Sequence, residues 1–417
     1  MEILYISSVP SAKEFQHIKS QCRTDKKGYV YGMNESGFKF HTLIMKGMCS
    51  RSDVHVTSVV GRSVGRSSHK GFYWKRYQEQ AGENLRYDHL GFLNFPVIKH
   101  LMVGAGFFGR TVKWLRKTRG QERAIIMDAA KVTAHPFVLA ANCLSKCHTS
   151  AIFCDIYEYM GDVKDARNND NVSFLHRMVR KLAASSYRKL DSFIFLAEEM
   201  SDVVNPEHKP YIVMEGLVDV NMQTVSNNLE DKVPQKTVMY AGSLNGSYGL
   251  KNLVEGFLAY SNPDARLWIF GAGDYEPQIR EAARQDERIL FGGALNLEQV
   301  VEKELQVTLM INPRPTDLEF TRYSFPSKNM EYMVSGTPIL TTRLPAMPRD
   351  YYDYIYTIDG NTPADITAAL EKVFALTPEE LHEMGGKARE FVLTKKNNVA
   401  QAGRILDLVC KERAKNS

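Results

Sequence analysis

The sequence contains no long apolar run. No window of its 417 residues approaches the roughly 18 consecutive apolar residues that a membrane-spanning helix needs. The first residues, MEILYI, are typical of a buried strand and not of the charged start of a signal peptide. We therefore expect a cytoplasmic protein.

Cysteine is also scarce. The six cysteines form no CxxC pair and no regular framework, which predicts neither disulfides nor structural zinc. Cys143, Cys147 and His148 come closest to a ligand cluster, because helical spacing brings the two cysteines together. Since no second pair accompanies them, we interpret both cysteines as core thiols.

Charge is distributed unevenly along the chain. Residues 1–200 carry 30 Lys and Arg against 18 Asp and Glu, net +12, and the remainder carries 23 against 30, net −7. A chain of 417 residues with 44% hydrophobic residues is too long for one ordinary core. We expect two domains with different partners.

The N-terminal half alternates between apolar strands and helices. Its predicted strands are residues 1–8, 54–60, 125–127, 150–154 and 192–196. Its predicted helices are residues 38–49, 138–144 and 174–187, and residues 9–37 are predicted to form a long polar loop. This order favours a parallel sheet covered by helices.

A second alternation follows and is more regular. Its predicted strands are residues 237–241, 266–270, 289–291, 308–312, 339–341 and 354–358. Its predicted helices are residues 250–260, 275–285, 297–305 and 328–334. The predicted fold class is α/β, with two Rossmann-like doubly wound domains at 1–214 and 236–396. Residues 215–235 form the predicted hinge, and a helix at 397–417 caps the second domain or crosses back to the first.

Small residues follow four predicted strands of the second half. They are Gly242-Ser243, Gly271-Ala272-Gly273, Gly292-Gly293 and Asn312-Pro313-Arg314. In parallel sheets, ligands bind beyond the carboxyl ends of the strands. The recurrence therefore predicts a ligand that the backbone approaches closely.

The segment 323–338, YSFPSKNMEYMVSGTP, joins a loop to a short helix. Pro326 favours an extended entry, and Ser327 is the predicted N-cap. Lys328 stands beside the amides of the first turn, which suit a phosphate, and Glu331 lies one turn further, within reach of a diol. The pattern indicates a nucleotide-sugar site. The alternative is a solvated helix in which Lys328 and Glu331 have no role.

The order of these motifs resembles a known family. The segments are VMYAGSL (238–244), LWIFGAG (267–273), FGG (291–293), INPR (311–314), FPSK (325–328) with Glu331, and GTP (336–338). They are similar to the donor domain of GT-B glycosyltransferases of family 4 (group 1), of the kind that builds cell-surface polysaccharides. The resemblance covers most of residues 237–342 and extends more loosely into the N-terminal half. It implies two Rossmann-like domains facing a cleft, with the nucleotide held by the C-terminal domain and the acceptor by the N-terminal one.

The resemblance also implies roles for single residues. Glu331 corresponds to the second glutamate of the family's E-x7-E motif, which binds the ribose hydroxyls of the nucleotide. The first glutamate falls at Tyr323, so Glu319 or the Tyr323 hydroxyl is expected to hold the donor sugar instead. His135, in the N-terminal half, is a further expected contact to that sugar. The expected catalytic residues are His135, Glu319, Tyr323 and Lys328.

The diphosphate needs a cationic partner. The basic pair that often follows the first strand of the domain aligns here with neutral Ser243 and Tyr248. Lys328 is the expected replacement, with Arg314, Arg322 and Lys251 as weaker candidates. The expected donor-binding residues are Gly242, Ser243, Gly271, Gly273, Arg314, Pro326, Ser327, Lys328 and Glu331.

The reaction implied by the resemblance is a retaining transfer of a hexose-type sugar. The donor is a UDP- or GDP-linked sugar, and the acceptor is a glycan or a lipid-linked saccharide. No metal, cofactor or protein nucleophile is expected, and no Asp-x-Asp motif follows a predicted strand. Catalysis rests on positioning and electrostatics. A GT-B epimerase of nucleotide sugars is an alternative, since it shares the donor fold.

A literal GxGxxG motif lies at Gly104, Gly106 and Gly109, and Asp128 follows at the end of a predicted strand. This is the fingerprint of an NAD-binding domain. Two polar residues, Lys99 and His100, interrupt the segment that would be its buried strand. An NAD-dependent enzyme is therefore the less favoured alternative.

The residues after these glycines, GFFGRTVKWLRKTRGQER (106–123), interleave basic and apolar side chains, and HKGFYWKRY (69–77) repeats the composition. The basic residues are Arg110, Lys113, Arg116, Lys117, Arg119 and Arg123. Such a surface favours contact with anionic lipid, as a peripheral protein on the inner face of the membrane. The alternative is a helix whose apolar side is core and whose basic side is solvated. No recognition motif for nucleic acid accompanies the charge, so no nucleic-acid partner is expected.

Overall fold

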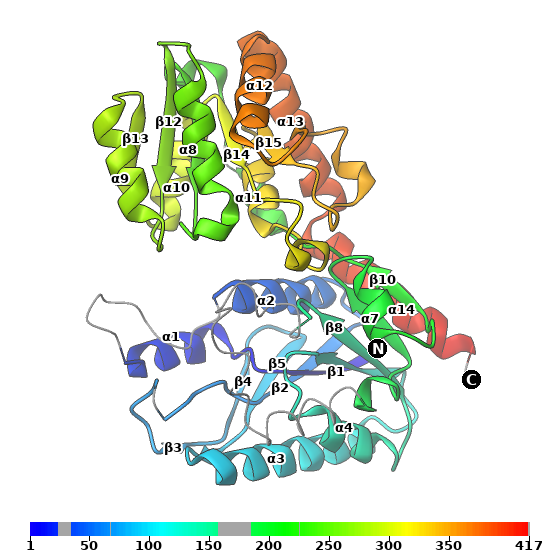
Figure 1. Ribbon diagram of the computed structural model, residues 1–417. Helices are drawn as coiled ribbons and strands as arrows, with labels where there is room; N and C mark the ends of the chain where they lie inside the picture. Colours follow the sequence, from blue (N-terminus) through cyan, green and yellow to red (C-terminus); the bar gives the residue numbers. More distant parts are fainter. Residues whose placement is uncertain (24–34, 67, 157–184, 225, 416–417) are drawn as a thin grey trace. The chain divides into compact units, whose positions relative to one another are not determined.

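The computed structural model describes residues 1–23, 35–66, 68–156, 185–224 and 226–415. The chain forms two compact units (Figure 1). The first unit comprises the chain up to Met214 together with Asn398–Ser417, and the second comprises Glu215–Asn397.

The first unit is built on a sheet of eight strands in the order β10-β9-β8-β7-β1-β2-β5-β4. Its strands are β1 (Glu2–Ser7), β2 (His55–Val60), β4 (Tyr77–Gln80), β5 (Leu85–His89), β7 (Arg123–Asp128), β8 (His148–Phe153), β9 (Ser192–Phe195) and β10 (Tyr211–Val213). Neighbouring strands are parallel except β4, which runs antiparallel to β5. A separate antiparallel pair joins β3 (Tyr73–Trp74) to β6 (Phe92–Leu93).

Helices cover both faces of this sheet. They are α1 (Ala12–Gln21), α2 (Glu35–Cys49), α3 (Pro96–Lys117), α4 (His135–Asn142), α7 (Met200–Val204) and α14 (Asn398–Lys415). Figure 1 shows α2 on one face and α3 with α4 on the other. The central strands β1 and β7 are buried on both faces, as expected of a doubly wound sheet.

The five strands predicted for this half are confirmed, with no end displaced by more than two residues. The predicted polar loop is wrong over Ala12–Gln21, because this segment is helix α1, which buries Phe15 and Ile18. Ser11 caps the helix by accepting a hydrogen bond from the Glu14 amide at 3.3 Å. So few apolar residues in ten positions left the helical period too weak to recognise. Most of the predicted helix 174–187 lies outside the described residues.

The GxGxxG motif lies inside helix α3, and the segment expected as a strand before it is the first part of the same helix. A Cβ atom at Gly104 would lie 2.4 Å from the Phe137 ring of α4, and one at Gly106 would lie 3.0 Å from Leu90. The two glycines therefore permit close packing of α3 within the unit. A dinucleotide fingerprint requires a strand, a tight turn and a helix, so the NAD interpretation is wrong.

Helix α14 at the end of the chain packs against α2 in the first unit. Ala402, Ile405 and Val409 are fully buried. The helices approach so closely that a Cβ atom at Gly47 of α2 would lie 2.0 Å from the Asn398 carbonyl oxygen.

The second unit contains a six-stranded, wholly parallel sheet in the order β13-β12-β11-β14-β15-β16. Its strands are β11 (Lys236–Ala241), β12 (Ala265–Phe270), β13 (Ile289–Gly293), β14 (Leu309–Asn312), β15 (Ile339–Thr342) and β16 (Tyr356–Ile358). Its helices are α8 (Leu250–Ala259), α9 (Glu276–Gln285), α10 (Leu297–Gln306), α11 (Ser327–Ser335), α12 (Pro363–Phe374) and α13 (Pro378–Lys395). Every element predicted for this half is confirmed. The two Rossmann-like units make up an α/β fold.

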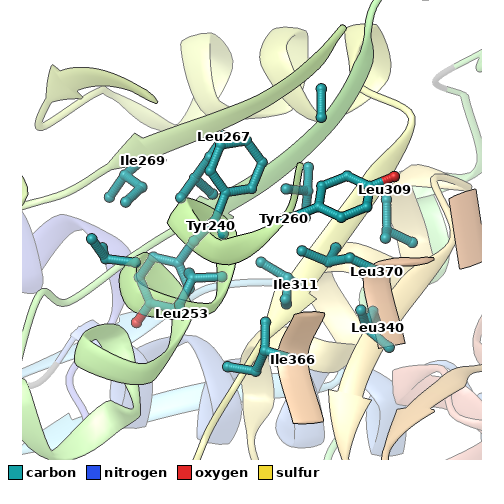
Figure 2. Close-up of a cluster of buried hydrophobic side chains, with 14 of the residues drawn as sticks. Tyr240, Leu253, Tyr260, Leu267, Ile269, Leu309, Ile311, Leu340, Ile366 and Leu370 are labelled. Atoms are coloured by element: carbon teal, nitrogen blue, oxygen red, sulfur yellow. The ribbon is translucent and has the colours of Figure 1, made fainter. Parts of the chain in front are cut away.

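One face of this sheet carries a large apolar core (Figure 2). Tyr240, Leu267 and Ile311 of the strands pack with Leu253 of α8 and Leu370 of α12, and all five are fully buried. This core fixes the carboxyl ends of β11, β12 and β14 relative to one another.

The predicted hinge, residues 215–235, is bonded to the second unit. The Val218 amide donates to Lys396 O at 3.0 Å, and the Val233 amide donates to Gln306 O at 2.9 Å. Asn227 donates through its side chain to Ser335 O at 2.8 Å. Its polar residues serve these contacts, so much of the segment packs on the second unit and is not a free linker.

All six cysteines are free in the structure. Cys143 is exposed, so its interpretation as a core thiol is wrong, and Cys147 is half-buried. Among the described helices, none is both long and apolar enough to cross a membrane.

The close contact of α2 with α14 predicts opposite effects for two helical Gly→Ala substitutions. Alanine is favoured over glycine in a helix by about 1 kcal/mol, and Gly403 of α14 has no heavy atom within 4 Å of its Cβ position. Gly403→Ala should therefore raise the free energy of unfolding slightly. Gly47→Ala should lower it by about 1–3 kcal/mol, because its methyl group meets backbone. Urea denaturation measures both variants, and equal stability would contradict this packing.

Candidate functional site

The carboxyl ends of β11, β12 and β13 are packed too closely for side chains. Gly242 and Gly271 have φ angles of +146° and +140°, which residues with a Cβ atom rarely adopt. A Cβ atom at Gly271 would lie 1.8 Å from Gly242 O, and one at Gly273 would lie 2.3 Å from Leu244 O. Backbone therefore forms this edge, as the glycine pattern predicts.

Helix α11 begins beside this edge. Pro326 is the N-cap and Ser327 is the first helical residue, so the prediction of Ser327 as the cap is displaced by one position. The helix ends at Gly336, whose φ of +77° is the left-handed conformation expected of a glycine stop. Ser327 and Glu331 are exposed, and Lys328 is partly buried.

The Lys328 ammonium lies over the end of β11. Its Nζ donates a hydrogen bond of 2.7 Å to the Tyr240 hydroxyl and lies 4.4 Å from the centroid of that ring. A Cβ atom at Gly242 would lie 2.0 Å from Lys328 Nζ, so a side chain at this position would displace the ammonium group. Burial lowers the pKa of Lys328 to about 8, the Glu331 carboxylate opposes this shift, and Arg314 adds to it.

Two buried hydrogen-bond networks hold α11 in register with the strands. Tyr332 donates to Ala241 O at 2.7 Å and accepts from the Ala241 amide at 3.0 Å. Asn312 of β14 donates to Asn329 Oδ1 at 2.6 Å, and Asn329 donates to Thr341 of β15 at 3.3 Å. Buried polar groups that are fully paired favour a single arrangement. They orient the first turn of α11 toward the strand ends.

Arg314 belongs to the same cluster of charges. Its guanidinium lies 4.7 Å from the centroid of the Phe320 ring and 5.7 Å from that of Tyr248. Lys328 Nζ lies 5.8 Å from the centroid of the same Tyr248 ring, so the two cations lie at one place. An anion between them would be stabilised by both.

The other two candidate cations are placed differently. Lys251 is exposed with its Nζ 3.9 Å from Glu255, and Arg322 is exposed with Nη1 3.9 Å from Glu319. Exposed ion pairs of this kind contribute little to the free energy of folding. Of the weaker diphosphate candidates, Arg314 is the one that the fold brings to Lys328.

Tyr323 and Glu319, the two candidates for the missing glutamate, contact each other. The Tyr323 hydroxyl donates to Glu319 Oε1 at 3.3 Å. Tyr323 is 7% exposed, whereas the Glu319 side chain is 47% exposed. The Glu319 carboxylate is therefore accessible to solvent, and the mostly buried Tyr323 donates a hydrogen bond to it.

His135 lies in the first unit, at the start of α4 and near the end of β7. Its ring is fully buried, with Nε2 3.1 Å from Asp128 O, and burial lowers its pKa. Its role toward a donor sugar stays a prediction.

Helix α3 contains most of the basic stretch, and the burial of its side chains shows which of them face the core and which face solvent. Phe107, Trp114 and Leu115 are buried, so its apolar side is core there, and Lys113 and Arg116 are exposed. The exposed apolar side chains gather instead on the first half of α3 and beside β3 and β6. They are Phe72, Tyr73, Leu93, Phe95, Val97, Ile98, Leu101, Met102 and Phe108, here named the apolar patch.

The site includes residues that sequence reasoning missed. Tyr240 reads as one more core residue of strand β11, and its hydroxyl was assigned no role. Tyr332 and Asn329 read as ordinary helical positions. A polar atom on a residue in an otherwise buried strand is the signal that points to Tyr240, because such atoms are normally paired.

Residues 235–375 match the glycosyl transferases group 1 family. The matched segment lies within the second unit and contains every predicted donor-binding residue, from Gly242 to Glu331. No curated protein matches the sequence.

Solved structures of the GT-B fold resemble the whole chain. Sucrose-phosphate synthase from Thermosynechococcus elongatus is 13% identical, with a TM-score of 0.65 and coverage of 100% of both chains. HepE of Anabaena in complex with UDP is 12% identical, with a TM-score of 0.59 over 99% of this chain and 100% of its own. The catalytic domain of starch synthase IV from Arabidopsis thaliana, bound to ADP and acarbose, is 9% identical, with a TM-score of 0.63 and 99% coverage of both. The chain therefore has the GT-B fold, with two Rossmann-like units, and these comparisons do not favour an epimerase.

The lowered pKa of Lys328 predicts a pH dependence for nucleotide binding. A diphosphate binds the charged ammonium, so UDP affinity should be highest below about pH 8 and should fall as pH rises through this value. Lys328→Met should weaken UDP binding by about tenfold or more at neutral pH and abolish the pH step. Titration calorimetry measures both effects.

Lys251→Met is the matched control, because Lys251 is an exposed lysine of the same domain. It should retain the affinity and the pH profile of the unsubstituted protein. A UDP affinity that is independent of pH, or equally weak in both variants, would contradict the assignment of Lys328.

Proposed function

We propose that the protein is a retaining glycosyltransferase that moves a hexose-type sugar from a UDP- or GDP-linked donor to a glycan or lipid-linked saccharide, in the synthesis of surface polysaccharide. The observation that carries the proposal is the Lys328 ammonium at the start of α11, held over the glycine edge of a group 1 domain. HepE in complex with UDP and glucose, and starch synthase IV bound to ADP and acarbose, support a nucleotide-linked donor and a glycan acceptor.

Lys328 and Arg314 bind the diphosphate, together with the amides of the first turn of α11 and the Gly242 edge. Glu331, exposed one turn further along α11, accepts hydrogen bonds from the ribose hydroxyls. Tyr240 fixes the position of the ammonium, so little reorganisation is needed when charge develops on the leaving group.

In the reaction, the bond between the anomeric carbon and the diphosphate oxygen breaks. The acceptor hydroxyl forms its new bond on the same face of the sugar, and its proton passes to a phosphate oxygen. Lys328 and Arg314 stabilise the negative charge on the diphosphate. We propose that these steps need no metal and no cofactor.

Glu319 replaces the missing first glutamate in this proposal, because its carboxylate is exposed and Tyr323 holds it by a hydrogen bond. It accepts hydrogen bonds from hydroxyls of the donor sugar. Tyr323, which is mostly buried, acts as a positioning residue.

Docking on an anionic membrane is a further part of the proposal. The apolar patch inserts among the lipid headgroups, and acidic lipid is attracted by the exposed Lys113, Arg116 and Lys117 of α3 and by Arg119 just after it. This places a protein of the cytoplasm on the inner face of the membrane, where lipid-linked acceptors are accessible.

The donor assignment predicts the effect of Glu331→Gln. The substitution removes the charge that accepts from the ribose hydroxyls, so UDP affinity should fall by roughly tenfold. Glu390→Gln, in an exposed helical glutamate of the same unit, should leave it unchanged. Equal UDP affinity in both variants would remove Glu331 from the site.

Activity is tested with a panel of UDP- and GDP-sugars in EDTA. Release of nucleotide with transfer of the sugar to acceptor or water supports the proposal. Dependence on added Mg²⁺ or Mn²⁺ would reject the metal-independent mechanism, and interconversion of sugars without release would reject transfer.

The membrane assignment predicts a difference between two leucines of equal exposure. Leu101 in the apolar patch and Leu144 elsewhere in the first unit are 64% and 65% exposed. Burial of a leucine contributes about 1.5 kcal/mol or more, so Leu101→Gln should weaken binding to phosphatidylserine vesicles about tenfold. Leu144→Gln should not, and equal vesicle binding by the two variants in a flotation assay would exclude the patch.

A further inference from the structure

A second cationic site lies in the first unit. A cavity of about 290 Å³ opens where β2 and β7 end, in the loops that follow these strands, and helix α3 forms its wall. Both strands flank β1 in the parallel sheet. This is the edge at which doubly wound sheets bind ligands. None of the residues assigned so far to the donor site contributes to the cavity.

Two lysines line this cavity. Lys131 follows β7 and Lys99 belongs to α3, and Ser63 and Thr133, which carry hydroxyl groups, belong to the same lining. No carboxylate occurs among the described residues that line it. Two lysines in a cavity whose described lining contains no carboxylate are the arrangement expected for an anion.

The lysines are built into the fold. The Lys99 ammonium donates to Val64 O. A Cβ atom at Gly61 would lie 2.7 Å from the Phe107 ring and 2.9 Å from Lys131 Cε, so this glycine makes room for both the ring and the lysine stem at the end of β2. Freely solvated lysines would require neither contact.

Electrostatics agree with this geometry. Burial lowers the pKa of Lys131 to about 8, the charge of Lys99 lowers it further, and Asp128 opposes the shift only weakly. Burial also lowers the pKa of Lys99. Asp128 accepts a hydrogen bond from the Ala130 amide at 2.9 Å, and its Oδ1 lies 3.7 Å from His41 Nε2. The unfavourable proximity of two cations is relieved when an anion binds between them.

The cavity shares its wall with the apolar patch. Lys99 lies between Ile98 and Leu101 on α3, and its Nζ is 5.5 Å from the centroid of Phe92 on β6. Gly65 also lines the cavity, and the residue after it is Arg66, whose guanidinium lies 4.8 Å from the centroid of Phe72 and 5.0 Å from that of Phe95. A molecule with a phosphate group in the cavity can therefore extend an apolar chain onto the patch.

We infer that the Lys99–Lys131 cavity binds a phosphate ester group of the acceptor. In naming the acceptor, this inference rests on the proposed function. The chemistry is that of a phosphate monoester or diphosphate ester, held by two ammonium groups and the hydroxyls of Ser63 and Thr133.

The test measures binding to the full chain with saturating UDP present, so that the donor site is occupied. One arm uses glucose 1-phosphate as a water-soluble phosphate ester. The other compares phosphatidylcholine vesicles with and without phosphatidic acid. The variants are Lys131→Met and Lys99→Met, and Lys46→Met is the control in an exposed lysine of α2. Thermal unfolding verifies that each variant is folded.

Lys131→Met and Lys99→Met should each weaken binding of the phosphate probe by about tenfold, with Lys46→Met unchanged. A loss confined to the vesicle arm identifies a lipid phosphate, and a loss confined to glucose 1-phosphate identifies a soluble ester. Each of these results supports the cavity. Equal affinities in folded Lys131→Met and unsubstituted protein in both arms would overturn the inference.

Binding of UDP is recorded separately in the same variants. Because the readout is binding and not turnover, loss of phosphate binding in Lys131→Met supports the cavity even if no sugar is transferred. Conversely, sugar transfer with unchanged phosphate affinity rejects the cavity alone.

Discussion

A partly buried ammonium group loses hydration, so it needs hydrogen-bond partners that fix its position and offset this loss. Lys328 is subject to this constraint. The Tyr240 hydroxyl accepts from it at 2.7 Å, Gly242 leaves the space that it occupies, and its pKa is lowered to about 8. Tyr240 is itself fixed in the apolar core between the sheet and the helices. The apolar core around Tyr240 thus sets the position of one charge at the surface of the second unit before any ligand binds.

A partly buried lysine beyond a strand end is also found in the first unit. Lys131 also lies beyond the end of a parallel strand, against a glycine, with its pKa lowered to about 8 by burial. Both units therefore have partly buried cations where strands end. In both, binding of an anion would neutralise this positive charge. Two cationic sites suit a reaction in which donor and acceptor each carry phosphate, which is what we propose.

Local pattern was sufficient for much of the fold. Strands β11 to β15 are short apolar runs bounded by glycine, asparagine or proline, and α11 has a clear proline entry and glycine stop, so their positions could be predicted. Helix α1 was missed because only Phe15 and Ile18 mark its buried side. The glycines of α3 were misleading, because close helix packing and phosphate turns both require a residue without a side chain.

By itself, the sequence determined the two α/β units, the glycine edge and the presence of Lys328 and Glu331 on one short helix. Each of these features can be predicted from residues that lie within a few positions of one another in the sequence. Only the tertiary structure decided that Tyr240, 88 residues from Lys328, holds its ammonium, that Arg314 joins it, and that Lys99 and Lys131 share a cavity. Such pairings arise from the order and register of strands, which are set by packing of the whole sheet and leave no local trace in the sequence.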